Sequence, residues 1–145
     1  MRLAFAVASV IANNHKEQVL KVAAMPMVAN PVEWLCVTET DRATYKFNLS
    51  LLHRQVVPDD ILRFEKPSGV AADAVHAAER DDRARVFLGF ARFATIEVVG
   101  SDCVTQTLVQ FADLRYTEPG KGRGTFSLDV PVDCPVLTGE VDERH

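Results

Sequence analysis

The side chains best suited to binding chemistry are arginines and one aspartate near the predicted junctions between helix and strand. Arg92 ends a predicted helix, and Asp113 and Arg115 share one face of a long predicted strand that follows. Together with Arg63 they can form an anion pocket, because a guanidinium offers a planar fork to carboxylate or phosphate. The same residues can instead form a structural ion pair that ties a helix to the sheet. The sequence favours this second interpretation.

Three aromatic side chains suggest a second kind of site. Trp34, Tyr45 and Tyr116 lie on predicted strands and can line an apolar pocket together with Arg92. Large aromatic side chains are also the main fillers of protein cores, and the chain has a single tryptophan. The sequence therefore leaves open whether these residues bind a ligand or pack in the core.

No complete catalytic or metal-binding motif is present in the sequence. The four histidines are His15, His53, His76 and His145. None has a second ligand at metal-binding spacing, and the H-E-x-x-H, G-x-x-x-x-G-K and G-x-S-x-G motifs are missing. The alternating glycines of 120–124 fall between predicted strands, as in a hairpin loop. We therefore expect no catalytic, cofactor-binding or metal-binding residue in this chain.

Composition places the 145-residue chain among ordinary globular domains. Apolar residues make up 48% and charged residues 25% of the sequence. The net charge of −4 and the pI of about 5.5 argue against a nucleic-acid partner, which usually requires a basic face. Cys36, Cys103 and Cys134 are odd in number and widely spaced, so we expect free thiols rather than a disulfide framework or a zinc site.

The first residues predict a helix over 2–23, because good helix formers run there without Pro or Gly. Its first part, 3–12 (LAFAVASVIA), is apolar but too short to span a bilayer, which takes about 20 residues. A helix packed on the core is the first interpretation. The remains of a membrane-proximal helix and a signal peptide are the second and third.

The rest of the chain alternates between strand and helix patterns. Apolar and polar residues alternate over 44–51, which predicts a β-hairpin over 32–52. The other expected elements are a short strand at 61–64, helices at 69–80 and 83–91, strands at 94–99, 103–116 and 125–130, and an acidic tail at 131–145. The expected helix at 83–91 starts at an aspartate cap and carries Val86, Phe87 and Phe90 on one stripe, and a β-bulge near 109–112 would reconcile the mixed pattern of the long strand.

These elements predict an α+β fold. After an N-terminal helix, a bent antiparallel sheet of about five strands would carry two short helices on one face. The expected organisation is an N-terminal helix in 1–24, the α+β domain in 25–130 and the tail in 131–145.

Several short segments, read in order, resemble one family. Residues 25–31 (MPMVANP), Trp34 and 37–40 (VTET) look like a "P-x-x-x-N-P-x-x-W … V-x-E-T" connector and strand, and Tyr45 fits the strand after it. Residues 87–94 (FLGFARFA) resemble "F-L-x-F-(A/S)-R-F-P", with alanine in place of the last proline. Residues 113–116 (DLRY) match "D-L-R-(Y/F)", and 126–128 match the closing strand. The family is the bacterial membrane-bound metal-dependent hydrolases, similar to YdjM and also labelled LexA-binding, inner-membrane-associated hydrolases.

The resemblance covers about 22–130 and corresponds to the soluble C-terminal part of longer members. It implies a divalent metal held by an H-x-x-x-(T/S)-H motif in an N-terminal membrane part, and no histidine of this chain matches that motif. We therefore expect a non-catalytic accessory domain that binds a ligand or a partner, such as the membrane part of a longer protein. The resemblance also favours the interpretation of 3–12 as a membrane-proximal segment of a membrane-associated parent.

Two alternatives remain open at this point. The chain can be a free-standing ligand-binding or enzymatic domain with a cone-shaped sheet, similar to nuclear-transport-factor-like or cystatin-like folds, and it would then be cytoplasmic. It can also be a protein-interaction module that adds a strand to a partner through a sheet edge.

Overall fold

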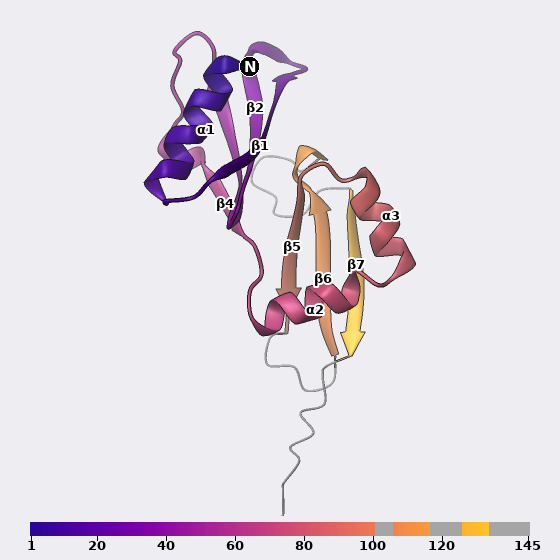
Figure 1. Ribbon diagram of the computed structural model, residues 1–145. Helices are drawn as coiled ribbons and strands as arrows, with labels where there is room; N and C mark the ends of the chain where they lie inside the picture. The colour runs from indigo at the N-terminus through magenta and orange to yellow at the C-terminus, as the bar shows by residue number, and fades with distance from the viewer. Residues whose placement is uncertain (101–105, 117–125, 134–145) are drawn as a thin grey trace, which may run out of the picture.

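The computed structural model describes residues 1–100, 106–116 and 126–133 and confirms an α+β fold with an N-terminal helix (Figure 1). The strands form two antiparallel sheets instead of one bent sheet of about five strands. The first sheet has the order β1-β2-β3-β4 and the second the order β5-β6-β7. The elements are α1 (Arg2–Asn14), β1 (Val19–Met27), β2 (Asn30–Thr40), β3 (Ala43–Ser50), a 3-10 turn η1 (Pro58–Asp60), β4 (Leu62–Glu65), α2 (Val70–Ala78), α3 (Asp82–Phe90), β5 (Ala94–Val99), β6 (Gln106–Asp113), a 3-10 turn η2 (Leu114–Tyr116) and β7 (Ser127–Asp133).

The predicted helix over 2–23 is too long, because the chain turns into a strand after α1. Helix α1 ends at Asn14, and Lys16 takes a left-handed backbone conformation with φ of 56°. Strand β1 then pairs antiparallel with β2 along the segment that was expected to be a helix end and a connector. Tertiary pairing therefore overrides the helix propensity of residues 19–23.

The hairpin predicted over 32–52 is confirmed. Strands β2 and β3 pair from Glu33 opposite Ser50 to Glu39 opposite Thr44, with the chain reversing at residues 41–42. The short strand expected at 61–64 is also present as β4, which pairs with β3 and forms one edge of the first sheet.

One face of the first sheet packs against α1. The apolar face of the helix packs on alternate residues of β2 and β3. In β3 these are the apolar residues of the alternating pattern, which all point to the same side of the sheet. Ala4 and Ala8 let the helix approach the sheet closely, and Tyr45, Phe47 and Leu49 fill the space beneath it. Of the expected free thiols, Cys36 lies in this core, whereas Cys103 and Cys134 lie outside the described residues.

Helices α2 and α3 cover one face of the second sheet (Figure 1). The predicted aspartate cap of α3 is confirmed, since the Asp81 side chain accepts a hydrogen bond from the backbone N–H of Arg83. The expected apolar stripe is only partly correct. Phe87 is buried in the core, whereas Val86 and Phe90 are 61% and 68% exposed.

The expected β-bulge near 109–112 is wrong, because β6 pairs with both neighbours in unbroken register. The apolar residues at both odd and even positions of this segment have another cause. Val109 and Phe111 face the α2 side, while the turn η2 redirects Leu114 to a different core. The expected tail also begins later than 131, since β7 extends to Asp133, and the loop of 118–124 lies outside the described residues.

A small third core joins the two sheets. Val37 of β2, Phe93 before β5 and Leu114 are fully buried together, with Phe64 of β4 packed against them. The other face of the first sheet thus rests on one end of the second sheet. None of the described helices combines the length and apolar character needed to cross a membrane.

Candidate functional site

The Arg92, Asp113 and Arg115 cluster forms a brace between α3, β5 and β6. The Asp113 carboxylate has no exposed surface and pairs with the Arg115 guanidinium, with 2.7 Å between Nη2 and Oδ2. The Asp113 carboxylate also accepts hydrogen bonds from the backbone N–H groups of Arg92 and Arg115, at 3.1 and 3.0 Å. Arg115 donates in turn to the Phe90 carbonyl at the end of α3. These contacts satisfy the carboxylate within the protein.

A second buried carboxylate lies beneath α1 and was not expected from the sequence. Glu17 accepts hydrogen bonds from the hydroxyls of Thr40 and Tyr45, at 2.7 and 2.9 Å, and from Arg63 at 2.5 Å. Arg63 also donates to the Tyr45 hydroxyl and pairs with Glu65. Each sheet therefore holds one buried carboxylate that is neutralised by one arginine.

Hydrogen bonding keeps both carboxylates ionised. Burial raises the pKa of Glu17, but the hydrogen bonds from Arg63, Thr40 and Tyr45 outweigh this effect and hold the pKa below its usual value. The pKa of Asp113 is lowered by the same balance, because the Arg115 side chain and two backbone N–H groups outweigh its burial. Neither group is thereby prepared as a general acid or base near neutral pH.

The structure does not bring the seven predicted site residues together. Tyr45 and Arg63 belong to the Glu17 cluster, while Arg92, Asp113 and Arg115 belong to the brace. The Trp34 indole donates to the Pro31 carbonyl near the β1–β2 turn. Tyr116 is exposed and lies edge-on to Phe126.

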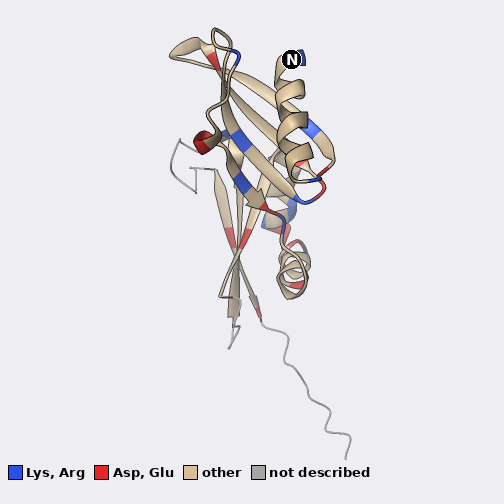
Figure 2. Ribbon diagram, turned by 90° about the vertical axis from the view of Figure 1, so that its left-hand side faces the viewer, with Lys and Arg blue, Asp and Glu red and all other residues tan. Residues whose placement is uncertain are grey.

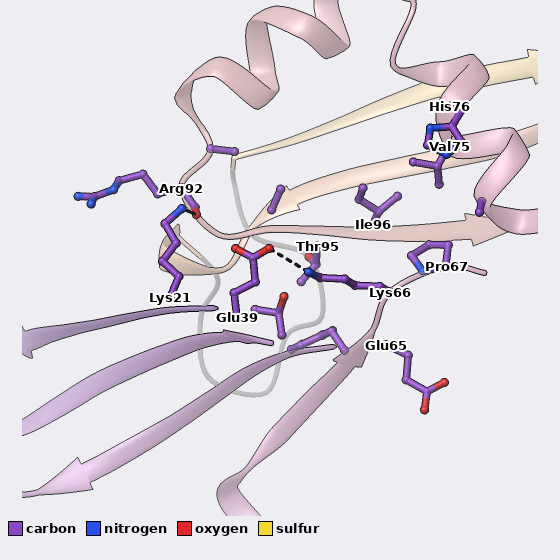
Figure 3. A pocket seen from close by; sticks show the side chains of 15 residues that line it. Lys21, Glu39, Glu65, Lys66, Pro67, Val75, His76, Arg92, Thr95 and Ile96 are labelled. Atoms are coloured by element: carbon purple, nitrogen blue, oxygen red, sulfur yellow. Dashed lines mark hydrogen bonds and ion pairs between the residues drawn. The ribbon is translucent and has the colours of Figure 1, made fainter. Parts of the chain in front are cut away.

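A cleft of about 380 Å³ lies between the two sheets (Figure 3). This size lies in the range of about 300–1,000 Å³ typical of small-molecule sites. The cleft is lined by the ends of β1–β4, the segment after β4, α2 and the start of β5. Its lining residues are Lys21, Glu39, Thr44, Phe64, Glu65, Lys66, Pro67, Ala72, Val75, His76, Ala91, Arg92, Ala94, Thr95 and Ile96.

Charged groups of the cleft gather on the side of the first sheet. The Lys66 ammonium pairs with the Glu39 carboxylate at 2.9 Å (Figure 3). The Lys21 ammonium donates to the Arg92 carbonyl at 2.6 Å and lies 4.9 Å from the centre of the Phe93 ring. The arginine side chain itself points away from the cleft.

The opposite wall of the cleft is mainly apolar. Small and aliphatic side chains of α2 and β5, among them Val75 and Ile96, form most of it, and His76 and Thr95 add polar groups. An apolar wall that faces a few fixed charges suits an amphipathic ligand, since the wall buries the ligand body and the charges orient it. Among the described residues, no group of three or more His, Cys, Asp or Glu side chains is placed to hold a metal ion.

Sequence reasoning missed the charged residues of the cleft. Lys21 was assigned to a helix, so its partner across the sheets could not be inferred, and Lys66 was assigned to a loop. Glu39 was correctly placed on a strand of the hairpin predicted over 32–52, but without its lysine partner. The cleft depends on how two sheets meet, and no local pattern encodes that contact.

Comparisons of the chain with protein-family models, with curated proteins and with solved structures find no match.

Proposed function

We propose that this chain is a non-catalytic accessory domain, and that the cleft between its two sheets binds an amphipathic ligand for a membrane-associated parent protein. The observation that carries the proposal is the cleft itself, whose walls come from both sheets and combine an apolar surface with two lysines. The resemblance of short segments to membrane-bound hydrolases suggests the parent, and the lining of the cleft suggests the ligand chemistry.

The state of the ionisable groups supports binding over catalysis. Lys66 is paired with Glu39, and Lys21 is bound to a backbone carbonyl across the sheets. A nucleophile or general base needs a free path to the substrate. Paired lysines at the rim of an apolar cleft are better suited to orient a carboxylate than to attack one.

An exposed apolar end of the first sheet supports a position next to a membrane. We call this surface the apolar end; its residues are Met1, Phe5, Val28, Leu51 and Leu52. The N-terminus, the β1–β2 turn and the connection after β3 lie at this end (Figure 1). The connection after β3 lies next to the start of β2, because the Leu51 N–H donates a hydrogen bond to the Val32 carbonyl.

The apolar end has the chemistry of a lipid contact. Val28 is fully exposed at the tip of the β1–β2 turn, and Leu52 is 71% exposed. Arg2 and Arg54 lie beside these side chains, with Glu33 as the acid closest in sequence to the turn. Apolar side chains that enter the acyl boundary and arginines that meet anionic headgroups bind a membrane surface together.

Thermal stabilisation by ligands tests the cleft. Apolar carboxylic acids, from hexanoate to indole-3-acetate, should raise the melting temperature of the protein in proportion to their binding. Lys66→Met should weaken binding, whereas Glu39→Gln should strengthen it, because it frees Lys66 for the ligand. Lys16→Met serves as the control, since Lys16 lies outside the cleft. The ligand proposal fails if no acid stabilises the protein or if the two cleft variants shift affinity in the same direction.

Vesicle flotation tests the membrane position. The protein should float with vesicles of mixed phosphatidylcholine and phosphatidylglycerol, and brominated lipids should quench Trp34, the single tryptophan. Val28→Ser with Leu52→Ser should reduce vesicle binding at least tenfold, since burying a leucine or valine side chain is worth about 1.5–3 kcal/mol. Val86→Ser with Phe90→Ser removes two exposed apolar groups of α3 and should leave binding unchanged. Equal losses in the two double variants would count against a specific membrane face.

A further inference from the structure

We infer that the outer edge of β5, which borders the cleft, also binds an extended peptide segment with alternating apolar and basic side chains as an added strand. This inference rests on the proposed binding role of the cleft and adds a partner that uses its apolar wall instead of its lysines. It depends on the backbone of β5, on two hollows that flank this strand, and on the charge of the second sheet.

Among the described residues, no strand pairs with the outer edge of β5. β5 is an edge strand of the described second sheet, because this sheet has the order β5-β6-β7. The Leu114 N–H donates to the Phe93 carbonyl at 3.1 Å. Phe93 and Leu114 are therefore a hydrogen-bonded pair of the antiparallel ladder between the two strands. Hydrogen-bonded pairs alternate along an antiparallel ladder. The backbone groups that point away from β6 are therefore those of Ala94, Ile96 and Val98.

Two hollows lie on opposite faces of this edge. The cleft, about 380 Å³, includes Ala94, Thr95 and Ile96 in its wall and lies towards α2. A second hollow, about 340 Å³, lies on the other side, where Thr95, Glu97, Gln110 and Ala112 line it together with Phe64 and Glu65. Phe64 and Glu65 of β4 border both hollows, so the free edge of β5 faces the edge of the first sheet across them.

This arrangement matches what an added strand requires. Successive side chains of a strand point to opposite faces, so alternate residues of a docked peptide would enter the two hollows in turn. Main-chain hydrogen bonds supply affinity in this mode of recognition, and pockets for alternate side chains supply specificity. The α2 side offers Val75 and Ile96 to apolar side chains, and the other side offers Glu97 and Gln110 to polar ones.

Charge decides which polar side chain is preferred. The strands of the second sheet contain no lysine or arginine within their bounds but four acids, Glu97, Asp113, Asp129 and Asp133. In Figure 2 these strands carry red segments and no blue ones. Asp113 is neutralised by Arg115, whereas Glu97 is exposed on the side of the second hollow. A lysine or arginine of the peptide would thus find a carboxylate beside β5.

The test uses a blocked heptapeptide in which valine and lysine alternate. It should bind the intact protein and slow the hydrogen exchange of the Ala94, Ile96 and Val98 amides, as measured by NMR. A peptide of the same composition with its valines and lysines in two blocks should bind at least tenfold more weakly, and so should the alternating peptide with alternate amides N-methylated. Glu97→Lys should reduce affinity about tenfold, whereas Glu33→Lys, the same charge change on the first sheet, should not.

Each outcome decides the inference. If the peptide does not bind, or binds without slowing exchange at these three amides, strand addition at β5 is wrong. If it fails while apolar carboxylic acids still stabilise the protein through Lys66, the inference falls and the binding role of the cleft stands. If neither class binds, both proposals fall together. If the N-methylated peptide binds as tightly as its parent, main-chain pairing is excluded and the inference is overturned.

Discussion

The buried carboxylate of Asp113 holds the Arg115 guanidinium and the backbone N–H of Arg92 at the same time, at 2.7 and 3.1 Å. Through this one side chain, the end of β6 is tied to the segment between α3 and β5. The same segment carries the carbonyl that Lys21 of the first sheet binds. The brace thus fixes the side of the cleft that belongs to the second sheet.

Removing the charge of Asp113 should destabilise the protein strongly. Asp113→Asn leaves the Arg115 guanidinium, which is 18% exposed, without its counter-ion. We expect a loss of about 3 kcal/mol in the free energy of unfolding, as for other buried ion pairs that lose one partner. Urea denaturation measures this change. Asp82→Asn removes an exposed pair with Arg85 and should have no measurable effect. Similar losses for the two variants would show that burial of the brace is not what stabilises it.

The lowered pKa values of Glu17 and Asp113 predict sensitivity to acid. A carboxylate whose pKa is lower in the folded state stabilises the protein above its unfolded pKa, which is about 4 for Asp and Glu. This stability is lost as the pH falls from there through the folded pKa values. The contribution of these two groups to the free energy of unfolding should therefore be constant between pH 6 and about 5 and should decline below about pH 4, as measured by denaturation.

The variant Glu17→Gln separates the contribution of one carboxylate. It should be less stable than the parent at neutral pH, and its stability should depend less on pH below about 4, because one titrating group is gone. Glu97→Gln is the matched control, since Glu97 is an exposed glutamate on β5. If the free energy of unfolding of Glu17→Gln falls below pH 4 as steeply as that of the parent, the partners of Glu17 do not lower its pKa in the folded state.

Local patterns predicted the elements that have a clear period or a clear cap. The alternation through Tyr45, Phe47 and Leu49 gave β3 its correct face, and Asp81 marked the start of α3. The two interpretations of the Arg92, Asp113 and Arg115 cluster were both visible in the sequence, and the structure places these residues in a brace.

The remaining features depend on contacts that are distant in sequence. Residues 19–23 have helix-forming composition, yet they form a strand because β2 offers a partner that buries Val22. The way in which the two sheets meet depends on the joint burial of Val37, Phe93 and Leu114. Glu17 gave no signal, because its three donors come from strands 23 to 46 residues away.

The thiol of Cys36 should be inert in the folded protein. Burial raises its pKa to about 11, and the side chain has no exposed surface. A variant with Cys103→Ser and Cys134→Ser leaves this thiol alone, and its labelling at pH 8 should follow global unfolding. The reaction rate with a chromogenic disulfide should then increase with urea in step with the unfolded fraction. Rapid labelling in the absence of urea would contradict the burial of Cys36 beneath α1.

The contact between the two sheets predicts that one substitution can uncouple them. Phe93 is fully buried between Val37 of the first sheet and Leu114 of the second, and Lys21 adds a bond to the neighbouring carbonyl. Each sheet has its own larger core, under α1 in one case and under α2 and α3 in the other. Phe93→Ala removes the largest side chain of the small core that joins them, so the cost of about 3–5 kcal/mol should fall mainly on the junction.

Two probes distinguish uncoupling from uniform destabilisation. Trp34 fluorescence reports on the first sheet, and hydrogen exchange of the β6 amides reports on the second. In the parent both should report one cooperative transition, whereas in Phe93→Ala their midpoints should separate. Phe47→Ala, which removes the same side chain from the core of the first sheet, should lower stability while the two probes still coincide. Coincident transitions in Phe93→Ala would mean that the sheets are joined by more than the Val37, Phe93 and Leu114 core.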